Sequence, residues 1–181
     1  SINFARENKL SEAIIELKQA INLKADNASY YGELGVIFLK QNNLNDAELF
    51  YKKAIDLSPD WPKFYQPLGE ILIKKNDLAG AFSVYQQALK LNPDNSELLL
   101  LIGDLMLKQN KLEQAEKYYK EAIDLTPNIS FYYRRMGDVF HRRKKFDLAI
   151  EHYKKAINLS PKIAYFYIHL GSSLAQQNKL D

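Results

Sequence analysis

A glycine recurs at a fixed interval along this chain, and the interval limits the folds that the chain can adopt. Alanines and a proline recur in register with it, so whole segments repeat rather than single residues. A period of about 34 residues is typical of stacked helical repeats, each of which buries its apolar face against its neighbours. The periodic glycines are Gly35, Gly69, Gly103, Gly137 and Gly171. We therefore expect an all-α array, an α-solenoid, rather than a domain with a single compact core.

Each unit contains two apolar stripes at helical spacing, separated by a polar turn. In the second unit the first stripe passes through Leu34, and the second passes through Ala47 and Tyr51. The turn holds an asparagine, which tolerates the left-handed backbone conformation that ends many helices. These asparagines are Asn8, Asn42, Asn76, Asn110 and Asn178, and Lys144 takes the same place in one unit. The pattern predicts antiparallel helix pairs, with a less favourable turn at Lys144.

Small residues mark the places where two helices approach closely. The glycine lies in the first helix of each unit and the alanines in the second, with a tyrosine between the alanines. A bulky residue at Gly103 should overpack its helix pair and cost about 1–3 kcal/mol. A proline follows each second helix and separates the units, because proline disfavours helix in the residue before it. Pro67 falls inside a first helix, where we expect either a tolerated first-turn irregularity or a kink.

This combination resembles the tetratricopeptide repeat. In the second unit the family's positions are matched by Tyr31, Leu34, Gly35, Phe38, Ala47, Tyr51, Ala54 and Pro59. The resemblance covers the whole chain as one array, 1–181, with a partial repeat at 1–27, full repeats at 28–61, 62–95, 96–129 and 130–163, and a first helix alone at 164–181. It implies a right-handed superhelix whose first helices line a concave groove that binds other molecules.

Under this resemblance, the residues of each first helix that are not used in packing face the groove. The groove then changes from small and apolar near its start to basic and aromatic near its end. The candidate partner-binding residues are Lys63, Gln66, Glu70, Asp104, Phe131, Arg134, Arg135, Asp138, His141, Tyr165 and His169. We expect a protein or peptide ligand there, with acidic groups favoured at the basic end.

The positive charge is concentrated in one unit. Residues 130–163 hold nine Lys or Arg and three Asp or Glu, a net charge of +6 in a chain whose net charge is +3. Arg134 and His141 lie seven residues apart and hence on one helix face. One interpretation is an anion-binding patch for an acidic peptide, a carboxylate or a phosphate. The other is a solvated helix end, where cations also interact favourably with the helix dipole.

Two binding modes known in the family do not fit the sequence. The clamp that grips the C-terminal carboxylate of heat-shock chaperones needs a lysine and an asparagine in successive registers, and these places hold, for example, Gln66 with Glu70 or Arg134 with Asp138. The asparagine ladder of the O-GlcNAc transferase scaffold is absent as well, since one of its places holds Pro67. The sequence therefore predicts neither of these two binding modes for this chain.

Catalytic and metal-binding patterns are missing from the sequence. It has no cysteine, no histidine with a partner at metal-ligand spacing, and no glycine loop that could cradle a phosphate. We expect no enzyme activity, no metal and no cofactor. No apolar run approaches the roughly 18 residues of a membrane span, so we expect no membrane association and a cytoplasmic location.

The leading functional hypothesis is a protein-interaction scaffold that binds a partner in its groove. The alternative is a non-catalytic repeat segment of a larger bacterial enzyme, such as a glycosyltransferase or sulfotransferase, because the chain begins partway through a repeat and looks like a cut segment. RNA binding is disfavoured by the strict period and by the lack of a continuous basic stripe. The open apolar ends of the array predict end-to-end self-association at high concentration.

Overall fold

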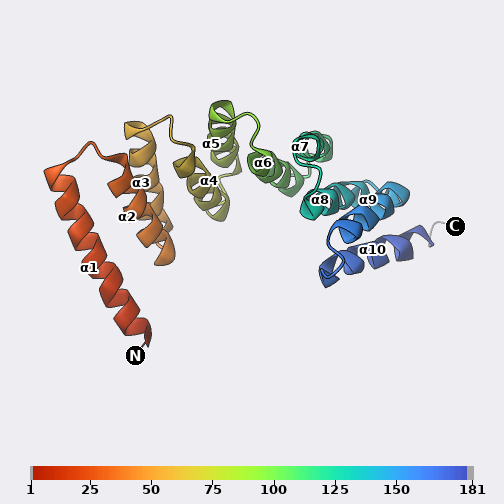
Figure 1. The fold of residues 1–181 in the computed structure, drawn as a ribbon, viewed down its shortest axis with the longest axis horizontal. Helices are drawn as coiled ribbons and strands as arrows, with labels where there is room; N and C mark the ends of the chain where they lie inside the picture. The colour runs from red at the N-terminus through yellow and green to blue at the C-terminus, as the bar shows by residue number, and fades with distance from the viewer. Residues whose placement is uncertain (1, 179–181) are drawn as a thin grey trace. The chain divides into compact units, whose positions relative to one another are not determined.

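The chain folds into an all-α helical repeat solenoid. The structure, a computed structural model, describes the backbone of residues 2–178 and the side chains of residues 9–178. Within these residues it contains α-helices, one short 3-10 helix and the turns that join them, and Figure 1 shows successive helices folding back on one another. The elements are α1 (Ile2–Leu23), α2 (Ala28–Lys40), α3 (Leu44–Leu57), η1 (Pro62–Phe64), α4 (Tyr65–Lys74), α5 (Leu78–Leu91), α6 (Ser96–Lys108), α7 (Leu112–Leu125), α8 (Ser130–Arg142), α9 (Phe146–Leu159) and α10 (Ala164–Gln177).

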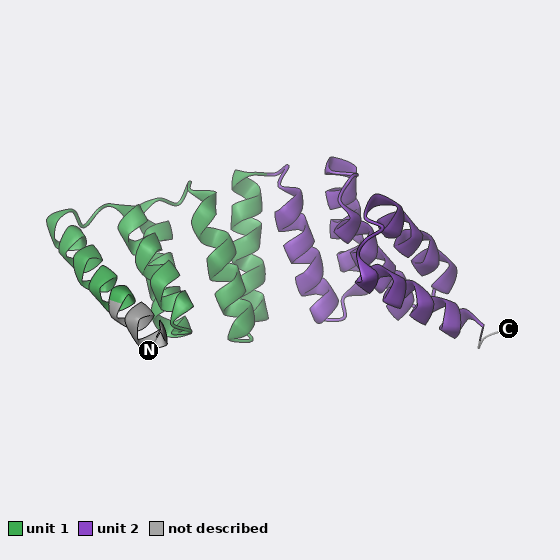
Figure 2. Ribbon diagram, turned by 60° about the horizontal axis from the view of Figure 1, so that its bottom comes forward, with its two compact units in different colours: residues 1–92 green, residues 93–181 purple. Residues whose placement is uncertain are grey.

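The helices form two compact units, which are coloured separately in Figure 2. Unit 1 comprises residues 1–92, and in it α1 packs on α2, α2 pairs with α3, and α4 pairs with α5. Unit 2 comprises residues 93–181, and in it α6 pairs with α7, α8 pairs with α9, and α10 packs on α9. We call α2, α4, α6, α8 and α10 the first helices, and α3, α5, α7 and α9 the second helices.

Each helix pair closes on a contact between a glycine and a tyrosine ring. The ring of Tyr119 from α7 lies on Gly103 of α6, where an added Cβ atom would stand 2.5 Å from the ring. The same contact joins Gly35 to Tyr51, Gly69 to Tyr85 and Gly137 to Tyr153. The sequence correctly predicted close approach at the glycines. The flat tyrosine ring fills the space that a side chain at the glycine would occupy.

The turn residues confirm the predicted left-handed backbone in the complete pairs. Asn42, Asn76, Asn110 and Lys144 have φ angles of 57°, 63°, 58° and 57°. The expectation was wrong at both ends of the array. Helix α1 continues through Asn8, and Asn178 keeps a right-handed φ of −65°. The left-handed turn lets a second helix fold back on the first helix. At Asn8 and Asn178 no such turn forms, and the helical conformation keeps the backbone hydrogen bonds.

The structure also confirms that each second helix ends just before a repeat proline. The residues before the four repeat prolines share one non-helical conformation, with φ between −145° and −139° and ψ between 74° and 83°, and each second helix ends one residue earlier. Pro67 lies in the first turn of α4, which begins at Tyr65 after η1. The first-turn interpretation of Pro67 is therefore confirmed, because amides in that turn have no partner within the helix.

Replacing Lys144 with asparagine is expected to stabilise unit 2 by about 0.5–1 kcal/mol, since asparagine adopts the left-handed conformation more readily than lysine. Urea unfolding followed by circular dichroism would measure the change. The reverse substitution, Asn110→Lys, serves as the matched control and should destabilise unit 2 by a similar amount. A lower stability for Lys144→Asn would contradict this account of the turn.

Candidate ligand pocket in unit 2

A buried ion pair lies on helix α8. Arg134 is only 6% exposed, and its Nη1 atom donates to Oδ2 of Asp138 at 2.6 Å, one helical turn away. The guanidinium also lies over the rings of Phe131 and Tyr165, at 5.9 and 5.6 Å from the ring centroids. Arg134 is thus held between a carboxylate and two aromatic rings, an arrangement that suits the planar guanidinium.

Two aspartates, one repeat apart, are anchored in the same way. Asp138 accepts a hydrogen bond from the Tyr153 hydroxyl at 2.9 Å, and Asp104 accepts one from the Tyr119 hydroxyl at 2.6 Å. Each aspartate directly follows the repeat glycine on which that tyrosine ring rests. Burial raises the pKa of Asp104 above its usual value, and the nearby Arg135 opposes the shift. The anchored aspartates therefore hold the arginines of α8 in place.

Most of the arginines in residues 130–163 are paired with acidic residues. Arg135 donates to Asp104 at 2.8 Å, and Arg143 forms ion pairs with Glu116 and, at 3.7 Å, with Glu113. Those acids belong to the preceding repeat, whose negative charge offsets the excess in residues 130–163. Arg134, Arg135 and Arg143 therefore each have an acidic partner within the chain.

A pocket with a volume of about 390 Å³ opens beside the ion pair. Three first helices and one second helix contribute its lining. The lining residues are Leu107, Arg134, Arg135, Asp138, His141, Arg142, Tyr153, Tyr165, His169 and Ser172. Six of the predicted partner-binding residues line this pocket: Arg134, Arg135, Asp138, His141, Tyr165 and His169.

The other predicted site residues lie elsewhere. Phe131 and Asp104 do not line the pocket, but Phe131 contacts Arg134 and Asp104 accepts a hydrogen bond from Arg135. Lys63, Gln66 and Glu70 belong to unit 1, where Gln66 donates to Glu70 at 3.3 Å. The Lys63 ammonium lies 4.4 Å from the centroid of the Trp61 ring, so it is engaged in a local cation–π contact.

Four lining residues are absent from the predicted set: Leu107, Arg142, Tyr153 and Ser172. The sequence indicates only a packing role for the repeat tyrosines, although a buried tyrosine hydroxyl needs a hydrogen-bond partner, and Asp138 is the partner of Tyr153. Arg142 is the one described arginine of α8 whose side chain is both exposed and part of the pocket lining. Its Nη1 atom donates to the Leu107 carbonyl at 2.9 Å, which tethers the end of α8 to α6.

Two histidines, His141 and His169, also line the pocket. Nδ1 of His141 lies 2.7 Å from the Ser173 hydroxyl, and Nδ1 of His169 lies 3.3 Å from Oδ1 of Asp138. Burial lowers the pKa of His169 below its usual value of 6.5, assisted by Arg134 and opposed by Asp138. Nε of Arg134 and Nε2 of His169 are buried and have no hydrogen-bond partner among the described residues. Unpaired polar atoms of this kind are rare in protein interiors.

The lowered pKa of His169 predicts that unit 2 is less stable in acid than at neutral pH. The unfolded chain binds a proton at this histidine before the folded chain does, so the stability that neutral His169 contributes is complete above about pH 6.5 and is lost as the pH falls below it. We expect the urea midpoint of unit 2 to fall between about pH 6.5 and pH 5, and to fall less in His169→Asn. An identical pH dependence in both proteins would refute the prediction.

The repeat pattern and the helix pairs define a class of protein, the helical repeat scaffold. Family models described as tetratricopeptide repeat match residues 28–60 and 72–134, and one described as TPR repeat matches residues 4–42 and 137–178. The chain belongs to the tetratricopeptide repeat family, and it is therefore a protein-interaction scaffold in general character. No curated protein matches the sequence.

Solved structures share the fold at low sequence identity. MamA 41-end from Desulfovibrio magneticus RS-1 is 21% identical, with 84% of this chain and 86% of that chain covered and a TM-score of 0.77. YrrB, described as a TPR protein with an unusual peptide-binding site, is 21% identical, with coverage of 90% and 84% and a TM-score of 0.72. TTC0263, a thermophilic TPR protein of Thermus thermophilus, is 20% identical, with coverage of 96% and 95% and a TM-score of 0.69.

Two further findings concern the described residues. They include no group of three or more His, Asp or Glu side chains placed to hold a metal ion. None of the helices in this part of the chain is both long enough and apolar enough to cross a membrane.

Proposed function

We propose that this chain is a scaffold that holds an acidic peptide segment of a partner protein in the pocket of unit 2. The observation that carries the proposal is the pocket itself, a cavity of about 390 Å³ walled by arginine, histidine and tyrosine side chains from α8, α9 and α10. Peptide recognition commonly combines aromatic surface with a few fixed charges. The description of YrrB as having a peptide-binding site supports peptides as the ligand class.

Charge favours an acidic ligand even though two of the arginines are paired. The lining contains Arg134, Arg135 and Arg142 against one carboxylate, that of Asp138. Arg142 is exposed and makes no ion pair among the described contacts, so it can reach a carboxylate without breaking one.

The test is a selection from a random peptide library, followed by affinity measurements on an enriched peptide. We expect enrichment of peptides with Asp, Glu or a free C-terminal carboxylate. Arg142→Glu should weaken the affinity at least about tenfold, because it reverses the charge that faces the ligand. Lys154→Glu makes the same change of charge at an exposed residue of α9 outside the pocket, and it should leave the affinity within about twofold.

Two outcomes would reject the proposal. One is a library selection that enriches no peptide for the native chain. The other is an enriched peptide whose affinity falls equally in Arg142→Glu and in Lys154→Glu, since that result would reflect net charge rather than the pocket. Arg134 and Arg135 are unsuitable for the test, because an acidic residue at either place would face Asp138 or Asp104 and disturb the fold.

A further inference from the structure

One face of helix α8 leads out of the pocket. It carries Phe131, Arg135, Asp138 and Arg142, which follow one another at intervals of four, three and four residues. Because an α-helix completes a turn in about 3.6 residues, these intervals return each side chain to nearly the same side of the helix. Arg135, Asp138 and Arg142 line the pocket, whereas Phe131, near the start of the helix, does not. The four residues define a path along the helix, which we call the α8 path.

Two half-exposed aromatic rings lie at the Phe131 end of the α8 path. The rings of Phe131 and Tyr165, which we call the aromatic platform, occupy equivalent positions one repeat apart and flank the Arg134 guanidinium. Phe131 is 45% exposed and Tyr165 is 50% exposed. Lys63 and Glu97 occupy the same position in earlier repeats and are exposed as well, so the exposure is a property of this repeat position. Such rings suit stacking against an aromatic side chain of a ligand.

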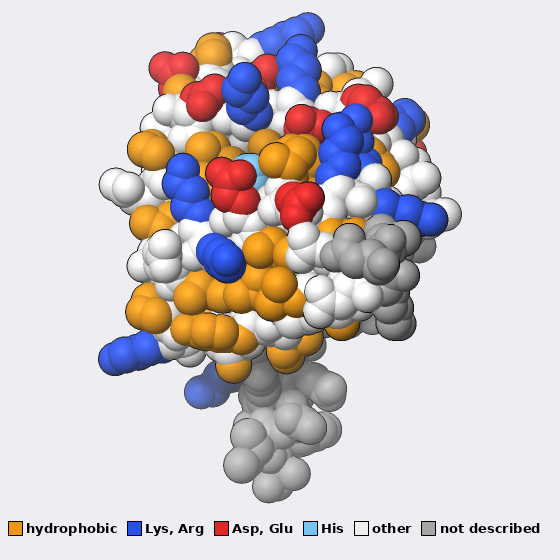
Figure 3. Space-filling model, turned by 90° about the vertical axis from the view of Figure 1, so that its right-hand side faces the viewer, with side chains coloured by type: hydrophobic (Ala, Val, Ile, Leu, Met, Phe, Trp, Pro, Cys, Tyr) orange, Lys and Arg blue, Asp and Glu red, His pale blue; other side chains and the backbone are white. Residues whose placement is uncertain are grey.

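The rest of the α8 path differs from the aromatic platform in its charge. In the middle, Arg135 donates to Asp104 at 2.8 Å and Asp138 accepts from Arg134 at 2.6 Å, so both charges are matched within the chain. At the far end, Arg142 is exposed and makes no ion pair among the described contacts. Figure 3, which views the molecule from the side on which α10 lies, likewise shows hydrophobic side chains next to charged side chains and a histidine. The α8 path thus offers apolar surface at one end and an available positive charge at the other.

The length of the α8 path determines how far apart the matching groups of a ligand must be. Phe131 and Arg142 are eleven residues apart in the sequence, which corresponds to about 16.5 Å along the helix axis. An extended peptide advances about 3.3 Å per residue and covers this distance in about five residues. A peptide that lies along α8 therefore reaches both ends of the path with side chains about five positions apart.

We infer that the partner peptide carries an aromatic residue about five positions from its acidic residue, and that the aromatic side chain stacks on the aromatic platform while the acidic group meets Arg142. The inference rests on the proposed peptide-binding function. The occupant is part of the same peptide because the platform adjoins the pocket, and Tyr165 and Arg134 belong to both. An acidic group would gain little at the platform, since the charge of Arg134 is already matched by Asp138.

The sequences of the peptides enriched in the library selection give the first test. We expect an aromatic residue about four to six positions from Asp, Glu or the C-terminal carboxylate, in one fixed order along the peptide. Enriched acidic peptides without an aromatic residue at that spacing would overturn this inference and leave the proposed function standing. A selection that enriches no peptide would reject both.

Affinity measurements on one enriched peptide test the aromatic platform directly. Phe131→Ala should weaken binding about fivefold, because the ligand ring loses its stacking partner. Phe131 also contacts the buried ring of Phe166, so Tyr165→Ala serves as a second variant with the same expected loss. Tyr165→Phe keeps the ring and should bind within about twofold of the native chain. Tyr167→Ala removes a ring of similar exposure, 48%, outside the pocket lining, and should also bind within about twofold.

A double-mutant cycle separates a contact with the ligand from an indirect effect of Phe131 on the fold. Replacing the aromatic residue of the peptide with alanine should weaken its binding to the native chain about fivefold. The same replacement should change binding to Phe131→Ala by less than about twofold, because that variant has already lost the contact. Equal losses with the two proteins would overturn the inference.

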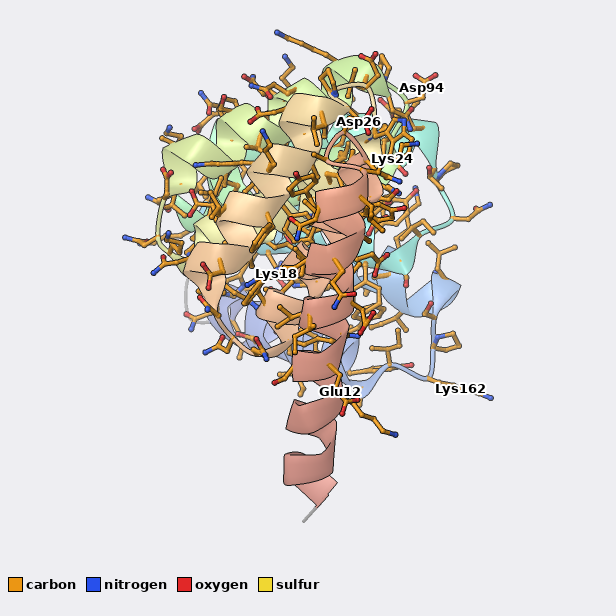
Figure 4. The ribbon with its side chains drawn as sticks, turned by 90° about the vertical axis from the view of Figure 1, so that its left-hand side faces the viewer. Glu12, Lys18, Lys24, Asp26, Asp94 and Lys162 are labelled. Atoms are coloured by element: carbon orange, nitrogen blue, oxygen red, sulfur yellow. The ribbon has the colours of Figure 1, made fainter. Side chains whose placement is uncertain are left out.

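The acidic end of the peptide needs a charge control close to the platform. Lys162 lies in the turn before α10, and its side chain projects away from the helices (Figure 4). Lys162→Glu makes the same change of charge as Arg142→Glu and should leave the affinity of the enriched peptide within about twofold. A loss in Lys162→Glu as large as that in Arg142→Glu would reject the proposed function together with this inference. A loss confined to Arg142→Glu, with none in Phe131→Ala or Tyr165→Ala, would overturn this inference alone.

Discussion

Gly103→Val is expected to lower the free energy of unfolding of unit 2 by about 3 kcal/mol. The ring of Tyr119 lies so close to Gly103 that even a first added carbon would stand 2.5 Å from it. Tyr119 is fully buried, and its hydroxyl is tied to Asp104 at 2.6 Å, so the ring cannot move without breaking that hydrogen bond. Urea unfolding at micromolar concentration, followed by circular dichroism, would give the change.

Gly171→Val is the matched control for this prediction. It makes the same substitution at the equivalent position of α10, where an added carbon would meet nothing within 4 Å. We expect its stability to stay within about 0.5 kcal/mol of the native value, because only the difference in helix propensity between glycine and valine remains. Equal losses in the two variants would show that the effect comes from the helix backbone and not from the tyrosine contact.

Asp138→Asn is expected to destabilise unit 2 by about 3 kcal/mol, because it leaves the buried charge of Arg134 without its partner. The side chains of Arg134 and Asp138 are 7% and 13% exposed, so water can do little to replace the lost ion pair. Asparagine keeps the size of the side chain and can still accept the hydrogen bond from Tyr153, so the substitution mainly tests charge. The same urea titration would measure the loss.

Asp124→Asn provides the reference for that experiment. Asp124 is an exposed residue near the end of α7, and its replacement should change the stability by no more than about 0.5 kcal/mol. In a second comparison, Arg134→Met combined with Asp138→Asn should lose less stability than Asp138→Asn alone, since no unpaired charge is left. A loss for Asp138→Asn as small as that for Asp124→Asn would mean that the buried pair contributes no net stability.

The fixed repeat period made most of the fold predictable. The features that the period predicted act within one repeat or between direct neighbours. They are the glycine at Gly103 and its equivalents, the left-handed turn at Asn110 and the proline that ends each repeat. Such contacts recur with the sequence that makes them, so a single chain shows them as a pattern. Six of the residues that the pattern placed on the groove-facing side of the first helices line one pocket.

The pattern misled at the two ends of the array. Asn8 and Asn178 have the residue type of a turn, but neither adopts the turn conformation, because a turn forms only where two helices pack together. The structure also shows that an added Cβ atom at Gly171 would meet nothing within 4 Å, unlike at the other four repeat glycines.

The sequence by itself therefore determined the repeat class, the helix boundaries and the glycine contacts, since these depend on local spacing and on packing between neighbours. Only the tertiary structure decided which charged side chains form ion pairs with one another. Arg135 meets Asp104 from 31 residues away and Arg143 meets Glu116 from 27 residues away, and these pairs join residues that the period does not relate. Whether a charged side chain binds a partner, an acid of its own chain or water depends on which groups the folded helices bring within about 4 Å, and the order of residues along the chain does not specify that distance.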